Sequence, residues 1–119
     1  MVEQFDGKIL GQTRPSSTTA ESIYSPDEKT KIARINGLLI VNTTAVPTTF
    51  RIFADNDGAV FDEDSALFFD NPLPGSTTVE LSFDALPLTL NNSAANIGVA
   101  TGTANAVTFT LFGEEKAMT

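Results

Sequence analysis

The chain of 119 residues contains no cysteine, no histidine and no tryptophan. Without cysteine it can form neither disulfides nor thiolate metal sites, and without histidine it lacks the commonest general base and the commonest metal ligand. It also has no glycine-rich phosphate-binding loop and no Gly-x-Ser-x-Gly nucleophile elbow. We therefore expect a protein that is not an enzyme and that needs no cofactor.

Basic residues are scarce as well, because 7 Lys and Arg stand against 15 Asp and Glu, for a formal net charge of -8. A charge of this sign repels nucleic acid and anionic membranes at long range. No apolar run is long enough to span a bilayer, and the N-terminus lacks the charged start and apolar run of a signal peptide. Direct binding to nucleic acid or membrane is not expected.

The sequence does contain many short apolar runs, separated by Pro, Gly, Asn, Asp, Ser and Thr, and it has no sustained helical periodicity. This pattern predicts strands. The clearest are residues 33–41, 48–54, 78–84 and 106–113, and weaker ones are 8–12, 20–24, 66–70, 88–90 and 97–101. We expect 33–41 and 48–54 to pair as a hairpin.

Both faces of the run 33–41 are apolar. Period-two alternation predicts that one face carries Ala33, Ile35, Gly37, Leu39 and Val41, whereas Leu38 and Ile40 lie on the other. Such a strand is expected to be covered on both sides or to lie at a subunit contact.

The predicted fold class is all-β: an antiparallel, jelly-roll-like β-sandwich over residues 20–113 with an extended N-terminal arm over 1–19 and a C-terminal tail over 114–119. Alternation in the first 19 residues is weak beyond Ile9 and Leu10. Two interpretations of the arm remain open, one in which it docks on a neighbouring subunit and one in which it is a frayed terminus without a role.

An acidic segment contains Asp55, Asp57, Asp62 and Asp64, whose oxygens are the hard ligands that calcium prefers. The match to a calcium loop is broken, since alignment on Gly58 puts Phe53 at the first ligand position. The alternative is a turn, because Asn-Asp-Gly sequences suit hairpin turns. Calcium, at this segment, is the only metal that the sequence suggests.

Apolar residues flank the acidic segment, at 59–61 and at 67–69. They are interpreted either as the inner faces of short strands or as part of a contact between subunits. On the second interpretation the candidate interface residues are Ile9, Leu10, Arg14, Phe61 and Phe68.

Five short motifs lie at or next to the chain's predicted strands: residues 18–24 (TTAESIY), 31–35 (KIARI), 39–44 (LIVNTT), 94–96 (AAN) and 104–113 (ANAVTFTLFG). In these motifs the sequence resembles small β-sandwich structural proteins of tailed phages, and the resemblance covers most of residues 17–113. In that family an apolar Pro-Gly turn joins the first two motifs. This chain departs from the family at two places, because residues 25–29 (SPDEK) replace that turn and an acidic insertion is present around 55–64.

The resemblance implies a capsid cement or decoration protein that binds between capsomers, with a tail, neck or fibre component as the alternative. It further implies a homotrimer whose partners are its own copies and the major capsid protein or other virion proteins, and which is located in the virion after synthesis in the host cytoplasm. A third hypothesis is a lectin-like carbohydrate-binding module, although the absence of Trp removes the ring that sugars most often stack on.

Overall fold

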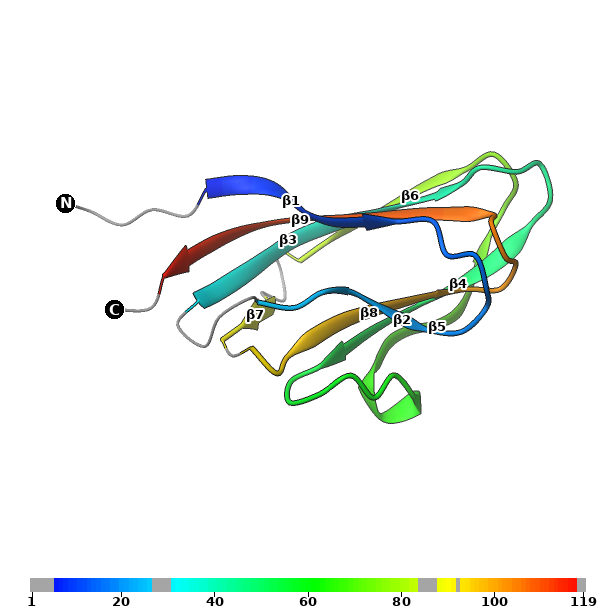
Figure 1. Ribbon diagram of the computed structural model, residues 1–119. Helices are drawn as coiled ribbons and strands as arrows, with labels where there is room; N and C mark the ends of the chain where they lie inside the picture. The colour runs from blue at the N-terminus through cyan, green and yellow to red at the C-terminus, as the bar shows by residue number, and fades with distance from the viewer. Residues whose placement is uncertain (1–5, 27–30, 84–87, 92, 118–119) are drawn as a thin grey trace.

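The computed structural model describes residues 6–26, 31–83, 88–91 and 93–117, and places nine strands in two antiparallel sheets that face each other (Figure 1). Sheet A has the order β1 (Asp6–Thr13), β9 (Val107–Ala117), β3 (Lys31–Asn42) and β6 (Thr78–Ser82), and β7 (Leu88–Leu90) also pairs with β3. Sheet B has the order β2 (Glu21–Tyr24), β8 (Asn96–Thr101), β4 (Thr48–Asp55) and β5 (Ala66–Leu73). A short 3-10 helix, η1 (Glu63–Ser65), precedes β5.

The pairings are nested, as in a long hairpin that has been rolled up. With β7 set aside, the first strand pairs with the last (β1 with β9), the second with the seventh (β2 with β8), the third with the sixth (β3 with β6) and the fourth with the fifth (β4 with β5). Eight strands in two sheets with this connectivity form a jelly roll. The predicted fold class is confirmed, as are all nine predicted strands.

The core lies between the sheets and consists of side chains from the inner faces of both. Period-two alternation on β9 buries Val107, Phe109 and Leu111 as expected. They pack against further buried residues, which include Ala33, Ile35, Leu38, Ile40, Phe50, Ile52, Ile97 and Val99.

The predicted faces of β3 are wrong beyond Asn36. The pairing with β9 shifts register between Ile35 and Gly37, so Asn36 is the extra residue of a β-bulge. The bulge reverses the alternation: Ala33 and Ile35 point inward, but so do Leu38 and Ile40. Leu39, expected on the same face as Ala33, therefore lies with Val41 on the outer face of sheet A.

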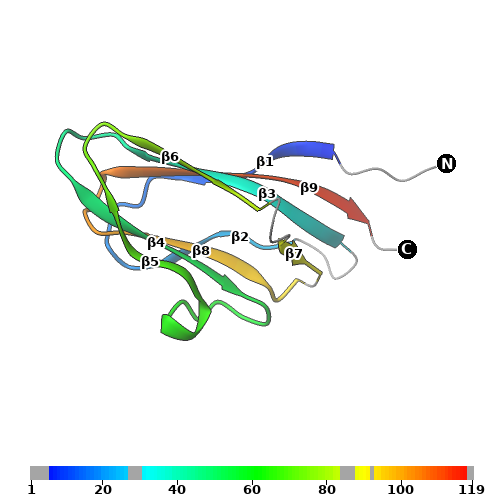
Figure 2. The same cartoon turned by 180° about the vertical axis from the view of Figure 1, so that it is seen from behind.

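The expected hairpin between 33–41 and 48–54 is also wrong, because β3 and β4 lie in different sheets. Both edges of β3 are occupied, by β9 on one side and by β6 and β7 on the other. The segment 43–47 instead carries the chain from sheet A to sheet B (Figure 2).

The expected N-terminal arm differs from the structure over residues 6–13, since β1 pairs along β9 of its own chain. Residues 14–20 then cross from sheet A to sheet B. Much of the expected tail is likewise strand, because β9 continues to Ala117. Residues 1–5 of the arm, 27–29 of the Pro-containing turn, and 118–119 of the tail lie outside the described residues. None of the described residues belongs to a helix that could cross a membrane.

Candidate interaction surfaces

The acidic segment forms a loop held by its own hydrogen bonds. The Asp55 carboxylate accepts the backbone N–H of Val60 at 2.8 Å and that of Asp57 at 3.1 Å, and these bonds lower the pKa of Asp55. The Asp62 carboxylate caps η1 by accepting the N–H of Asp64 at 3.0 Å, and the Ser65 hydroxyl accepts the N–H of Asp62 at 3.2 Å.

These four aspartates line a shallow depression of about 330 Å³. Within the described part of the chain, however, no three acidic side chains come close enough together to hold a metal ion. The backbone bonds of Asp55 and Asp62 account for the shape of the loop without an ion. Calcium binding stays a prediction.

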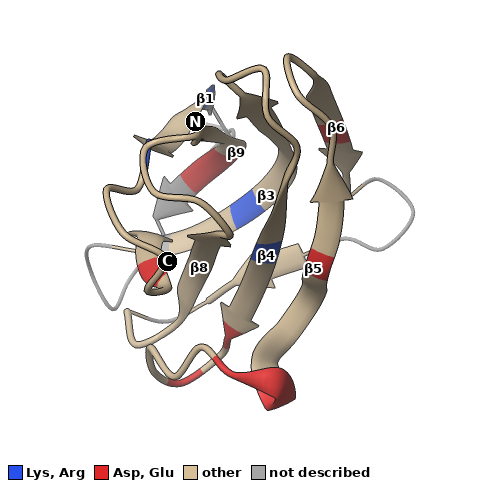
Figure 3. Ribbon diagram, turned by 90° about the vertical axis from the view of Figure 1, so that its right-hand side faces the viewer, with Lys and Arg blue, Asp and Glu red and all other residues tan. Residues whose placement is uncertain are grey.

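Phe61 fixes the acidic loop on the outer face of sheet B. Its ring lies 5.7 Å from that of Phe53, which points outward from β4 and is nonetheless buried. The same ring rests on Gly98 of β8, where a Cβ atom would lie 2.6 Å from it. The chain thus covers part of this face itself. Figure 3 shows the resulting group of acidic residues around η1.

The five predicted interface residues fall in different environments. Ile9 is 54% exposed on β1, and Arg14 is exposed in the connection after it. Leu10 packs against the core, and the half-buried Phe68 lies 6.2 Å from Phe50. Leu10, Phe61 and Phe68 therefore make their main contacts inside the chain, and the subunit contacts foreseen for them stay predictions.

Next to Phe68, a bulge in β5 brings three outward-facing side chains together. Arg51 makes two hydrogen bonds to the Asp70 carboxylate, at 2.6 and 3.0 Å, and its guanidinium lies 3.9 Å from the centre of the Phe69 ring. The hydrogen bond raises the pKa of Arg51 and lowers that of Asp70. A polar hollow of about 260 Å³ lies beside the pair, lined also by Thr18, Thr49 and Thr101.

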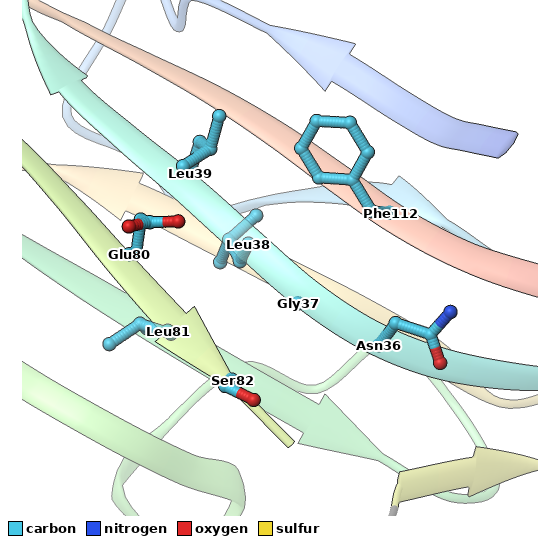
Figure 4. Close-up of a pocket in the computed structure, with 8 residues that line it drawn as sticks. All are labelled: Asn36, Gly37, Leu38, Leu39, Glu80, Leu81, Ser82 and Phe112. Carbon is cyan, nitrogen blue, oxygen red and sulfur yellow. The ribbon is translucent and has the colours of Figure 1, made fainter. Parts of the chain in front are cut away.

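The outer face of sheet A carries a second surface, which the sequence did not reveal. Leu39 and Phe112, from β3 and β9, line a hollow of about 390 Å³ together with Glu80 and Ser82 of β6 (Figure 4). A hollow of about 380 Å³ adjoins it and shares Asn36 and Phe112. It reaches Ile9 on β1. We call this surface the sheet A groove.

One signal in the sequence could have revealed the groove. Gly37 follows Asn36 in the middle of an otherwise apolar run, and a glycine inside a strand often marks a bulge. Shifting the alternation by one residue at this point would have placed Leu39 and Val41 on the outside.

Four connections gather at the end of the sandwich that lies on the right in Figure 1, and they contain no acidic residue: residues 14–20, 43–47, 74–77 and 102–106. The buried Asn42 ties two of them together. Its amide donates to the carbonyls of Val46, Leu73 and Pro74 at 2.9 to 3.3 Å, and its oxygen accepts the N–H of Thr44 at 2.9 Å. This loop end is therefore preorganised.

Comparison with known proteins gives a likeness of fold alone. No protein-family model and no curated protein matches the sequence. Among solved structures, one of the T13 viral particle of infectious bursal disease virus matches with a TM-score of 0.52 and 12% identity over 95% of this chain and 30% of the other. A structure of the Gx strain of that virus gives 0.48 and 14% over 97% and 32%. The chain thus spans about a third of the length of each of these two chains.

Proposed function

We propose that this chain is a structural protein of a virus particle and acts by assembly. The observation that carries the proposal is the jelly-roll order of the strands, which runs through the described chain from β1 to β9. Jelly rolls are a recurrent fold of viral capsid domains. The match to a protein of an icosahedral virus particle, with a TM-score of 0.52, supports the same role.

The specific role that we propose is a cement or decoration protein of a tailed-phage head, in line with the sequence resemblance. A surface that binds between capsomers needs shape and contact area rather than reactive groups. The preorganised loop end, which has no acidic residue and where Val46 is 67% exposed, is a surface that an acidic chain can present to other proteins without strong repulsion. The major capsid protein is the expected partner.

Co-sedimentation tests this role. The purified chain is mixed with heads, with tails, and with neither, and bound protein is quantified after centrifugation. Saturable binding to heads, together with a higher temperature of head disruption, is expected for a cement protein. Binding to tails alone would move the role to the tail, neck or fibre, and binding to neither would count against a virion role. Light scattering of the free chain tests the homotrimer expected from the resemblance.

A carbohydrate-binding module is the second candidate, because lectin domains also use the jelly roll. The observation in its favour is the polar hollow beside Arg51 and Asp70 with Phe69 41% exposed at its side. Calorimetric titration with a panel of sugars tests it. Heat of binding that disappears in the variant Asp70→Ala would favour this candidate.

A further inference from the structure

The outer faces of the two sheets differ in how the chain covers them. On sheet B, Phe61 covers Phe53 and Gly98, and Ala100 is 4% exposed beside the crossing segment at Thr18. On sheet A, no described segment covers the groove in this way: Ile9 is 54% exposed, and Leu39, Val41 and Phe112 are half-buried. A row of aliphatic and aromatic side chains across neighbouring strands is typical of a covered sheet face.

We propose that the sheet A groove is a contact between two copies of this chain, packed face to face about a two-fold axis. The inference rests on the proposed function and names one of the chain's own surfaces for self-assembly, but it replaces the homotrimer that the resemblance implies with a dimer of the free chain. Three properties of the face support a second copy as its occupant: its charge, the placement of its charged residues, and its area.

The first property is low net charge. The charged residues with described side chains that line the groove or point outward beside it are two basic and two acidic, namely Lys8, Arg34, Glu80 and Glu114, whereas Glu115 lies opposite the buried Ala33 and accepts a hydrogen bond from Tyr24 of sheet B. The whole chain has 7 basic and 15 acidic residues. Two copies that meet at this face therefore avoid most of the repulsion that their acidic surfaces would produce.

The second property is self-complementarity. Arg34 and the exposed Glu80 both point outward from sheet A. Arg34 lies on β3 before Gly37, and Glu80 lies on β6 opposite Leu39, which follows Gly37 on β3. Consider a two-fold axis that lies in the plane of the contact and runs midway between Arg34 and Glu80. This axis places Arg34 of each copy opposite Glu80 of the other copy, so the Arg34–Glu80 ion pair forms twice. In an isologous contact every such pairing is repeated by symmetry.

The third property is area. Four strands about 4.8 Å apart and a length of about seven residues at 3.3 Å per residue give roughly 440 Å² per copy. The pair then buries roughly 900 Å², which is the size of a weak, transient interface. The contact is therefore expected to be reversible and to depend on concentration.

The test measures the mass of the full chain by light scattering over a concentration series that reaches the millimolar range. The expected result is a concentration-dependent rise from 12.6 kDa to twice that mass. Ile9→Lys is expected to weaken the association at least about 10-fold, because it places a hydrated charge in the contact. The matched control Leu67→Lys changes a residue of similar exposure, 45%, on sheet B, and is expected to leave the association unchanged.

Charge reversal tests the axis. Arg34→Glu and Glu80→Arg should each weaken the association, and the double variant should recover it, with circular dichroism confirming that each variant is folded. A monomer at all concentrations, a trimer, or an association that Ile9→Lys leaves intact would overturn the inference. Head binding by the unaltered chain separates the two proposals: a chain that binds heads but stays monomeric at every concentration refutes this contact alone, whereas a chain that pairs but does not bind heads refutes the cement role alone.

Discussion

The buried Asn42 allows the sharpest test of how the loop end is held together. Its amide nitrogen lies within hydrogen-bond distance of the carbonyls of Val46, Leu73 and Pro74, and its oxygen accepts from both the backbone N–H and the hydroxyl of Thr44. The side chain is 1% exposed. Asn42→Ala therefore leaves several partly buried backbone groups without their partner.

The loss of stability in Asn42→Ala follows from the number of hydrogen bonds that the Asn42 side chain makes. Two amide hydrogens and one oxygen provide three or four bonds of about 1 kcal/mol net each, and an unsatisfied buried group costs more than the bond it lost. Because water can reach part of this loop end, we expect Asn42→Ala to lower the free energy of unfolding by about 2 to 4 kcal/mol. For a domain of this size the midpoint of thermal unfolding then falls by roughly 8 to 15 °C.

Circular dichroism during thermal and urea unfolding measures both quantities. Asn71→Ala, a half-buried asparagine on β5, is the matched control and should cost less than about 1 kcal/mol. The variant Asn42→Asp adds a pH test. The new carboxylate would face three carbonyl oxygens, which raises its pKa in the folded state. The free energy of unfolding of this variant should therefore approach that of the parent as the pH falls and the carboxylate is protonated. A loss below about 1 kcal/mol for Asn42→Ala would refute this account.

Three further predictions concern sheet B and its acidic loop. Gly98→Ala forces its new methyl group against the ring of Phe61, so it should cost about 1 to 3 kcal/mol in urea unfolding and speed proteolysis of residues 56–65; unchanged stability would contradict the packing described. The lowered pKa of Asp55 stabilises the fold above the usual aspartate pKa of about 3.9, and this contribution is lost as the pH falls, so acid unfolding of Asp55→Asn should show a weaker pH dependence than the parent. Calcium, if bound by the loop, must raise the midpoint of thermal unfolding relative to a chelator, and an identical midpoint in both would leave the loop as a turn.

The alternation of apolar and polar residues within short segments was sufficient to predict where the strands lie. Period-two alternation placed Val107, Phe109 and Leu111 inward, and the structure buries all three. Punctuation by Pro, Asn and Gly separated the remaining strands. The pairing of β3 with β9, β6 and β7 was not predicted, because it depends on contacts between residues far apart in the sequence.

The candidate surfaces were harder to predict, since each depends on one local irregularity. A single extra residue at Asn36 exchanges the two faces of β3, and the groove exists because of that exchange. For Phe61 the sequence leaves open the inner face of a short strand or a contact between subunits. In the structure its ring packs on Phe53, a residue on β4 that alternation alone places in the solvent-facing row, and the subunit contact stays a prediction.

If the chain is a component of a virus particle, as we propose, it must be found in purified particles. Quantitative mass spectrometry of particles from an infected culture that expresses the chain measures this. We expect many copies of the chain per particle, at a fixed ratio to the major capsid protein that persists through gradient purification. Absence of the chain from purified particles, with its recovery only in the soluble fraction of the lysate, would contradict the proposed function.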